Sequence, residues 1–251
     1  MPTKAADAWP NLPTDFKAPP VAADHLGVAR RLVILLACAL APTTIAAPTA
    51  QARRVLPDAA AAKLVKRSGF EPRPANYAAN HRVPTRAEIA YFRAHSDLPY
   101  PYRGRVSGHY RGTTGAILQW GARKWGFSPD LFRAVAVVES WWKMSAVGDN
   151  GDSLGLMQVR RPYHCCYPLT GQSSAFNVDY YGAYLRTLYD GRQTWLNTVE
   201  RGQTYRAGDL WGSVGEWASG RWHVAAGDVY VAKVRGRLAD RIWTSAGGFN
   251  S

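Results

Sequence analysis

The sequence of 251 residues lacks a continuous apolar run of the length that crosses a bilayer. Its clearest run, Leu32–Ala41, holds ten residues, whereas a membrane-spanning helix needs about 20. Arg30 and Arg31 precede this run and small residues follow it as far as Ala52, which is the layout of a secretory signal peptide. We therefore interpret residues 1–52 as an N-terminal extension and signal peptide, with translation starting at Val28. An uncleaved anchor is the alternative, and only then would a membrane be a partner.

Acidic residues are also scarce, since 18 Asp and Glu stand against 31 Lys and Arg, which gives a net charge of +13. Such an excess favours an anionic partner: nucleic acid, an anionic membrane face or an acidic cell-wall polymer. The sequence contains no nucleic-acid-binding motif. Together with the expected signal peptide, the charge predicts a secreted or cell-wall-associated bacterial protein that meets anionic cell-wall polymers and binds no nucleic acid.

Cysteine is rare, and only the adjacent pair Cys165 and Cys166 would remain after removal of residues 1–52. Tyr163 and His164 precede the pair, but three soft ligands in a row do not easily wrap one zinc ion and no fourth ligand is evident. We therefore expect no metal site. A disulfide between adjacent residues requires a distorted peptide, so a Cys165–Cys166 bond and two free thiols both stay open.

Strand-like alternation of apolar and polar residues is scarce, and no internal repeat is present. Helical periodicity and capping residues instead predict helices over 115–124, 129–139, 178–190, 194–200, 209–218 and 228–243. A small β-element is expected near Ser153–Val159. The predicted fold class is therefore mainly α, with a small β-element.

Three segments divide the chain by composition. After residues 1–52, residues 53–105 are rich in Ala, Pro and Arg, with little apolar periodicity, and we interpret them as a linker with one short helix. Thr85 and Glu88 also have the spacing of a capping box that opens a helix. Residues 106–251 form the predicted folded domain.

Glu139 is the strongest candidate for chemistry. It falls in the last turn of the helix that Ser128 and Pro129 open, close to Trp141 and Trp142. The negative end of the helix dipole and desolvation by aromatic side chains both favour the protonated carboxyl group. A Glu that stays protonated near neutral pH is the general acid that glycosidic cleavage needs. A half-exposed Glu that merely closes a helix is the alternative.

The residues around Glu139 resemble a known signature. The pattern A-V-x-V-E-S-x-W over Ala134–Trp142, followed by Gly151 and by Gly155-Leu156-Met157-Gln158, resembles the catalytic segment of soluble-type lytic transglycosylases and the related goose-type lysozymes. Asn177–Leu185 resembles the helix that follows in that family. The resemblance covers residues 106–251 and implies a lysozyme-like fold and cleavage of peptidoglycan glycan strands, without a cofactor.

The resemblance also implies roles for individual residues. Glu139 matches the catalytic acid and base of the family. Positions that match substrate-binding residues are Ser140, Asp149, Gly155, Met157, Gln158, Tyr163 and Trp217. Asp149 stands where goose-type lysozymes carry Asp and transglycosylases usually carry Ser.

Two departures from the family pattern bear on the mechanism. Arg160 stands where goose-type lysozymes have an acidic residue, and Trp217-Ala218 replaces a Tyr-Asn pair. An inverting hydrolase needs a second carboxylate to activate water, whereas a lytic transglycosylase needs one carboxyl group that acts first as acid and then as base. We therefore expect a lytic transglycosylase that forms anhydro-muramoyl ends. A goose-type-like muramidase and a non-catalytic glycan-binding protein are the alternatives.

Overall fold

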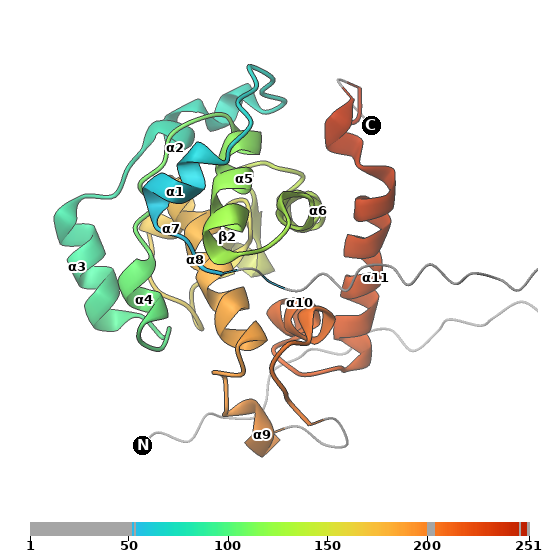
Figure 1. The fold of residues 1–251 in the computed structure, drawn as a ribbon. Helices are drawn as coiled ribbons and strands as arrows, with labels where there is room; N and C mark the ends of the chain where they lie inside the picture. Colours follow the sequence, from blue (N-terminus) through green and yellow to red (C-terminus); the bar gives the residue numbers. More distant parts are fainter. Residues whose placement is uncertain (1–51, 53, 200–203, 246, 250–251) are drawn as a thin grey trace, which may run out of the picture. The chain divides into compact units, whose positions relative to one another are not determined.

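The computed structural model describes residues 52, 54–199, 204–245 and 247–249. The expected signal peptide and start site lie outside these residues. The described part is mainly helical and carries one small sheet (Figure 1). No helix in it is long and apolar enough to cross a membrane. The predicted fold class, mainly α with a small β-element, is thus confirmed at this level.

Helices α5 (Thr114–Trp125), α6 (Pro129–Ser140) and α8 (Ser174–Tyr189) form the centre of the fold. Helix α5 packs against both α6 and α8. Gly121 and Gly182 allow the close approach of α5 and α8, because a β-carbon on Gly121 would lie 2.5 Å from Val178 Cγ1 and one on Gly182 would meet the Trp125 ring. Fifteen of the sixteen residues of α8 are buried, which marks it as the central helix.

Two further helices pack on one side of this centre. Helix α10 (Leu210–Ser219) contacts α8, and α11 (Ala225–Asp240) packs along both α10 and α6. Figure 1 shows α11 as the outermost of these helices, running beside α6. A short helix, α9 (Leu196–Val199), and the 3-10 turn η3 (Ile242–Thr244) complete the C-terminal half. Helix α11 begins and ends three residues earlier than the predicted range 228–243.

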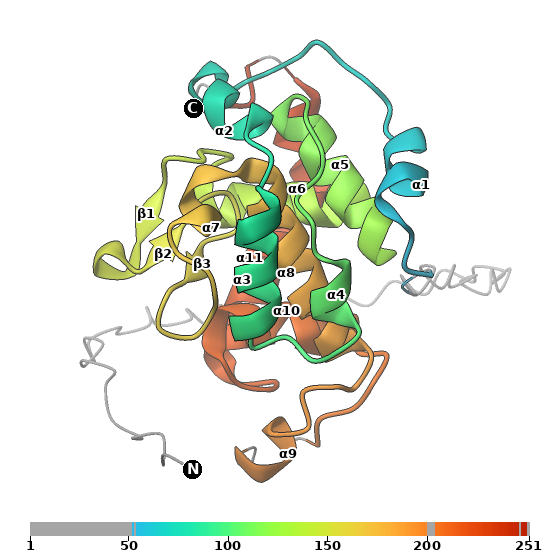
Figure 2. The ribbon, with the colours of Figure 1, turned by 90° about the vertical axis from the view of Figure 1, so that its left-hand side faces the viewer.

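The small sheet follows α6 directly. Three two-residue strands pair antiparallel in the order β1 (Val147–Gly148), β2 (Ser153–Leu154) and β3 (Val159–Arg160). The 3-10 turn η2 (Asp149–Gly151) joins β1 to β2. Figure 2 shows the strands together on one side, near α7 (Leu169–Gln172).

The structure differs from one expectation: residues 54–105 do not form a linker with one short helix. They hold the elements α1 (Asp58–Lys63), η1 (Pro74–Asn76), α2 (Tyr77–His81), α3 (Arg86–His95) and α4 (Tyr102–Arg105). Phe92 and Leu98 are at most 1% exposed and belong to the main hydrophobic core. The apolar residues are too widely spaced to show a period in the sequence, yet they pack onto α5 and α8.

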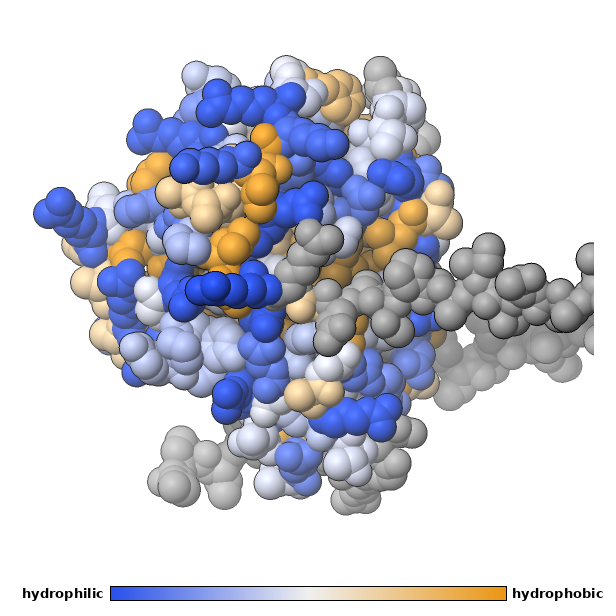
Figure 3. Space-filling model, in the orientation of Figure 1, coloured by the Kyte–Doolittle hydropathy of each residue, from blue (hydrophilic) through white to orange (hydrophobic). Residues whose placement is uncertain are grey.

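Some local predictions are confirmed at the residue level. Thr85 and Glu88 form the predicted capping box at the start of α3. Gly126 ends α5 in the left-handed conformation, with φ 82°. Helix α8 begins four residues before the predicted start, because Ser173 caps it and donor groups of the first turn are satisfied there. The face drawn in Figure 3 is mostly hydrophilic, as the excess of basic residues leads one to expect.

Candidate functional site

Glu139 lies in the last turn of α6, where the sequence predicts it. Pro129 occupies the first turn of that helix, and the chain leaves it at Trp141 with φ 55°. The Trp142 backbone N–H closes this end by donating to the Ala136 carbonyl oxygen at 3.2 Å. Glu139 is half-buried on the side of α6 that α11 covers. The turn therefore aims a single carboxyl group at the seam between α6 and the C-terminal helices.

The carboxyl group of Glu139 has an environment that favours its protonated form. Burial raises its pKa from the ordinary value of 4.5 to about 7, and the charge of Asp149 acts in the same direction. Hydrogen bonds from Tyr230 and Trp217 oppose this shift, and the Tyr230 hydroxyl donates to Glu139 Oε1. Both donors are neutral, so desolvation prevails and the group titrates close to neutral pH.

Trp217 of α10 is built into the site. It is half-buried, and its indole N–H also donates to the Met157 carbonyl oxygen at 3.2 Å. The His164 ring stacks on it, with centroids 5.1 Å apart and an angle of 10° between the planes. Tyr181 packs edge-on at 5.0 Å. These contacts hold Trp217 as a donor to the Glu139 carboxyl group, and the stacked His164 covers one face of a residue that we expected to bind substrate.

Asp149 approaches the site from the hairpin, but its carboxylate is already engaged. Ser153 donates its hydroxyl to Asp149 Oδ2 at 2.5 Å, and Arg160 Nε of β3 lies 3.6 Å from the same oxygen. Tyr163, expected to bind substrate, is 53% exposed and lies against the Arg160 guanidinium group at 5.1 Å. The unusual Arg160 thus couples two of the predicted site residues.

Hydrogen bonds with Asn177 of α8 fix the position of the Gly155–Gln158 turn. Asn177 is fully buried; its Oδ1 accepts from the Met157 N–H at 2.8 Å and its Nδ2 donates to the Leu154 carbonyl oxygen at 2.9 Å. Gly155 has φ 77°, and an added β-carbon would lie 2.6 Å from Asn177 Nδ2. Gln158 in turn donates to the Gly155 carbonyl oxygen at 2.9 Å. Glycine is required here by both the conformation and the close contact.

Two other residues that we expected to bind substrate instead support the backbone around Glu139. Met157 is completely buried, and Ser140 is 7% exposed. The Ser140 hydroxyl lies 2.8 Å from the Leu156 carbonyl oxygen and so links α6 to the turn. Side chains of the segment that the sequence pattern singled out thus serve partly to hold the backbone.

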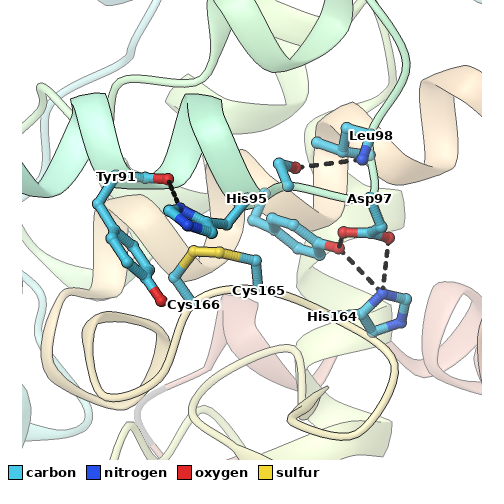
Figure 4. Close-up of a disulfide and its surroundings, with 9 residues drawn as sticks. Tyr91, His95, Asp97, Leu98, His164, Cys165 and Cys166 are labelled. Atoms are coloured by element: carbon cyan, nitrogen blue, oxygen red, sulfur yellow. Dashed lines mark hydrogen bonds and ion pairs between the residues drawn. A yellow bond between two sulfur atoms is a disulfide. The ribbon is translucent and has the colours of Figure 1, made fainter.

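The structure joins Cys165 and Cys166 in a disulfide between adjacent residues, next to α3 (Figure 4). His164 directly precedes the pair, and its Nδ1 lies 3.1 Å from Asp97 Oδ2 and 2.9 Å from the Tyr180 hydroxyl. Figure 4 shows His164 and Asp97 pointing toward one another. Within the described residues, no group of three or more His, Cys, Asp or Glu side chains could hold a metal ion.

Sequence reasoning missed Tyr230, which donates a hydrogen bond to Glu139. The last helix was predicted as the range 228–243, and the buried residues of α11 are Gly227, Tyr230 and Val234. Tyr230 precedes Val234 by four residues, so helical spacing alone contained this signal. Tyr181 is fully buried, and its hydroxyl makes no hydrogen bond within the part of the chain that the structure describes.

The sequence was compared with models of known protein families and with curated proteins, and neither comparison gives a match. The assignment of a function therefore depends on the geometry of the site and on the resemblance of its motif.

Proposed function

We propose that this protein is an exported lytic transglycosylase with a lysozyme-like fold, which cleaves the glycosidic bond between N-acetylmuramic acid and N-acetylglucosamine in peptidoglycan. The observation that carries the proposal is Glu139, a carboxyl group at a helix end with a pKa of about 7. General acid catalysis is most efficient when the pKa of the acid lies near the working pH. The motif resemblance supplies the substrate class, and the excess of basic residues fits an anionic cell wall.

In the proposed reaction, Glu139 acts twice. It first gives its proton to the glycosidic oxygen as the bond from that oxygen to the muramoyl C1 breaks. The resulting carboxylate then takes the proton of the muramoyl C6 hydroxyl, whose oxygen attacks C1 and closes the anhydro ring. The attacking group belongs to the same sugar, so its proximity replaces an activated water molecule. Glu139 ends protonated, ready for the next cycle.

The surroundings of Asp149 favour this route over hydrolysis. A hydrolase that inverts requires a second carboxylate free to accept a proton from water. Asp149 Oδ2 accepts the Ser153 hydroxyl and lies in an ion pair with Arg160, so this oxygen already has two protein partners. Asp149 remains close enough to act on Glu139 electrostatically, and its negative charge would stabilise an oxocarbenium-like transition state.

Incubation of the purified protein with sacculi, followed by mass spectrometry of the soluble products, tests the proposal. Anhydro-muropeptides are the expected products. Muropeptides with reducing muramic ends would instead identify a muramidase, in which Asp149 activates water. Protein that sediments with sacculi and releases no soluble product would identify a glycan-binding protein without catalytic activity.

A further inference from the structure

A cavity lies on the part of the molecule that we expected to be a linker. It has a volume of about 660 Å³ and opens between the segment after α1, helix α2 and the residues that lead into α5. None of the described residues that line it contacts Glu139. This volume is in the range of pockets that take small ligands, about 300–1,000 Å³.

Two arginines border the cavity. Arg67 and Arg111 are both exposed and line it from different segments of the chain. The Arg67 charge lies close enough to Tyr110, another lining residue, to oppose the rise that burial causes in the tyrosine's pKa. The carboxylate of Glu71, which also lines the cavity, is occupied: it accepts from the Thr114 N–H at 2.6 Å and the Arg73 N–H at 2.9 Å. The two guanidinium groups therefore favour an anionic ligand.

A buried amide in the lining has one unused acceptor. Asn80 is 2% exposed, and its Nδ2 donates to Glu71 and to Thr114 Oγ1, both at 3.1 Å. Its Oδ1 is buried and accepts no hydrogen bond from any residue that the structure describes. A buried acceptor without a donor costs about 1–3 kcal/mol. A ligand hydroxyl or amide N–H entering the cavity would remove this deficit.

Aromatic rings complete the lining. Tyr77 is 68% exposed, and the His81 ring lies against it with centroids 4.2 Å apart. Tyr110 is half-buried and stacks on Trp120 at 5.3 Å, which fixes its orientation. Exposed tyrosine rings offer an apolar face and a polar edge, the combination that suits a pyranose ring.

From these features we infer that the cavity is a second saccharide site, which binds a pyranose bearing an acidic group. The acidic group pairs with Arg67 and Arg111, a donor of the sugar satisfies Asn80 Oδ1, and the ring rests against Tyr77. The acid can be a carboxylate, as on muramic acid, or a phosphate, as on a phosphorylated wall polymer. On a wall-cleaving enzyme such a site would hold the chain on its polymer between cleavage events.

Isothermal titration calorimetry of the full protein with single sugars tests the inference. The probes are N-acetylmuramic acid, N-acetylglucosamine 6-phosphate and neutral N-acetylglucosamine, at low and high salt. We expect at least one acidic sugar to bind about tenfold more tightly than the neutral one, and the tighter acidic sugar identifies the source of the anion. The variant R67Q/R111Q should lose this tenfold preference, and Tyr77→Ala should weaken all three sugars. The matched variant R86Q/R105Q removes two exposed arginines elsewhere and should keep the preference.

Equal binding of acidic and neutral sugars, or a preference that survives in R67Q/R111Q, would overturn the inference. Arg67 and Arg111 are exposed, and circular dichroism of the variant verifies that the fold is kept. The titration involves no turnover, so it is decided independently of whether the protein cleaves glycan. Conversely, sacculus cleavage with no acidic-sugar preference would leave the proposed activity intact and remove the second site alone.

Discussion

Two carboxyl groups of this protein, Asp179 and Glu139, have opposite surroundings. Asp179 of α8 is completely buried between α5 and α8, where it accepts from Lys124 Nζ at 2.7 Å, the Trp125 indole N–H at 2.7 Å and the Ser107 N–H at 2.8 Å. Glu139, between α6 and the C-terminal helices, receives hydrogen bonds from two neutral donors among the described residues, Tyr230 and Trp217. The charge of Asp179 is thus balanced by a cation, whereas Glu139 can change its protonation state near neutral pH.

The difference separates a carboxylate with a structural ion pair from the one for which we propose a catalytic role. A buried charge without a counterion is costly and usually becomes neutral by a shift of its pKa. The fold supplies Asp179 with Lys124, which also pairs with Asp58 at 2.6 Å. Among the described residues, Glu139 has no such cationic partner. A strongly perturbed pKa that has no structural explanation is typical of functional sites.

The largest effect is expected from Glu139→Gln. The amide keeps the size of the side chain but can neither donate the acidic proton nor accept one, so glycan cleavage should fall on the order of 10³-fold or more. Release of soluble muropeptides from sacculi measures the loss, and sedimentation shows whether binding is kept. Glu88→Gln, which alters a capping residue on α3, serves as the control. Substantial cleavage by Glu139→Gln would contradict the assignment.

Removal of the cationic partner of Asp179 should affect the stability of the fold and not the cleavage reaction. Lys124→Met leaves Asp179 buried without its cation, which should lower the free energy of unfolding by about 3–5 kcal/mol. Urea denaturation measures this change. The matched variant Arg241→Gln breaks a pair with Asp130 in which the arginine side chain is 51% exposed, and should cost less than about 1 kcal/mol. Similar losses in both variants would remove the distinction between the two carboxylates.

Stability should also depend on pH through Glu139. Its pKa in the folded protein, about 7, exceeds the ordinary 4.5, so the folded state binds the proton more tightly than the unfolded state. The stabilisation is full below pH 4.5 and is lost as pH rises through 7. Compared with Glu139→Gln, the wild-type protein should therefore lose roughly 3 kcal/mol over this interval. Parallel pH curves for the two proteins would argue against the raised pKa.

Removing the Tyr230 hydroxyl should move the pH profile of activity. The hydrogen bond from Tyr230 stabilises the ionised carboxylate, so Tyr230→Phe should raise the pKa of Glu139 further. The alkaline limb of the cleavage rate, where the acid loses its proton, should shift upward by about one pH unit. Tyr181→Phe removes the same atom from a ring whose hydroxyl makes no hydrogen bond within the described residues, and it should leave the limb in place. A downward shift in Tyr230→Phe would reverse the assigned role.

The smallest effect is expected from Arg160→Gln. Loss of the 3.6 Å ion pair leaves the Asp149 charge less compensated, so the pKa of Glu139 should rise by a few tenths of a unit and stability should change by less than about 1 kcal/mol. Anhydro-muropeptides should remain the products. Arg161→Gln, which breaks the 3.0 Å pair with Asp152, is the control. A switch to reducing ends would show that Arg160 suppresses hydrolysis.

Local signals in the sequence predicted much of the helical framework. The capping box at Thr85, the helix opened by Pro129 and the stop at Gly126 depend on neighbouring residues, and all three are found. The same local reasoning placed Glu139 in the last turn of its helix. It failed for residues 54–105, where Phe92 and Leu98 become buried only through contacts with distant segments.

The partners of Glu139 depend on such distant contacts. Tyr230 lies 91 positions further along the chain, and its place opposite α6 follows from how α11 packs. The ion pair between Arg160 and Asp149 likewise follows from the hairpin register, which pairs Ser153 with Arg160. A motif identifies a carboxyl group, but the donors that tune it are known only once the helices are assembled.

Through the contacts of Asn177, the pKa of Glu139 depends on how the helices pack together. Its buried amide fastens the Met157 segment to α8, and the Met157 carbonyl oxygen receives the Trp217 indole that also faces Glu139. Four separate parts of the chain must therefore be in register before this carboxyl group titrates near pH 7. Its titration, followed by infrared or carbon-13 spectroscopy, would report whether the helices are correctly docked, even in a variant with no substrate present.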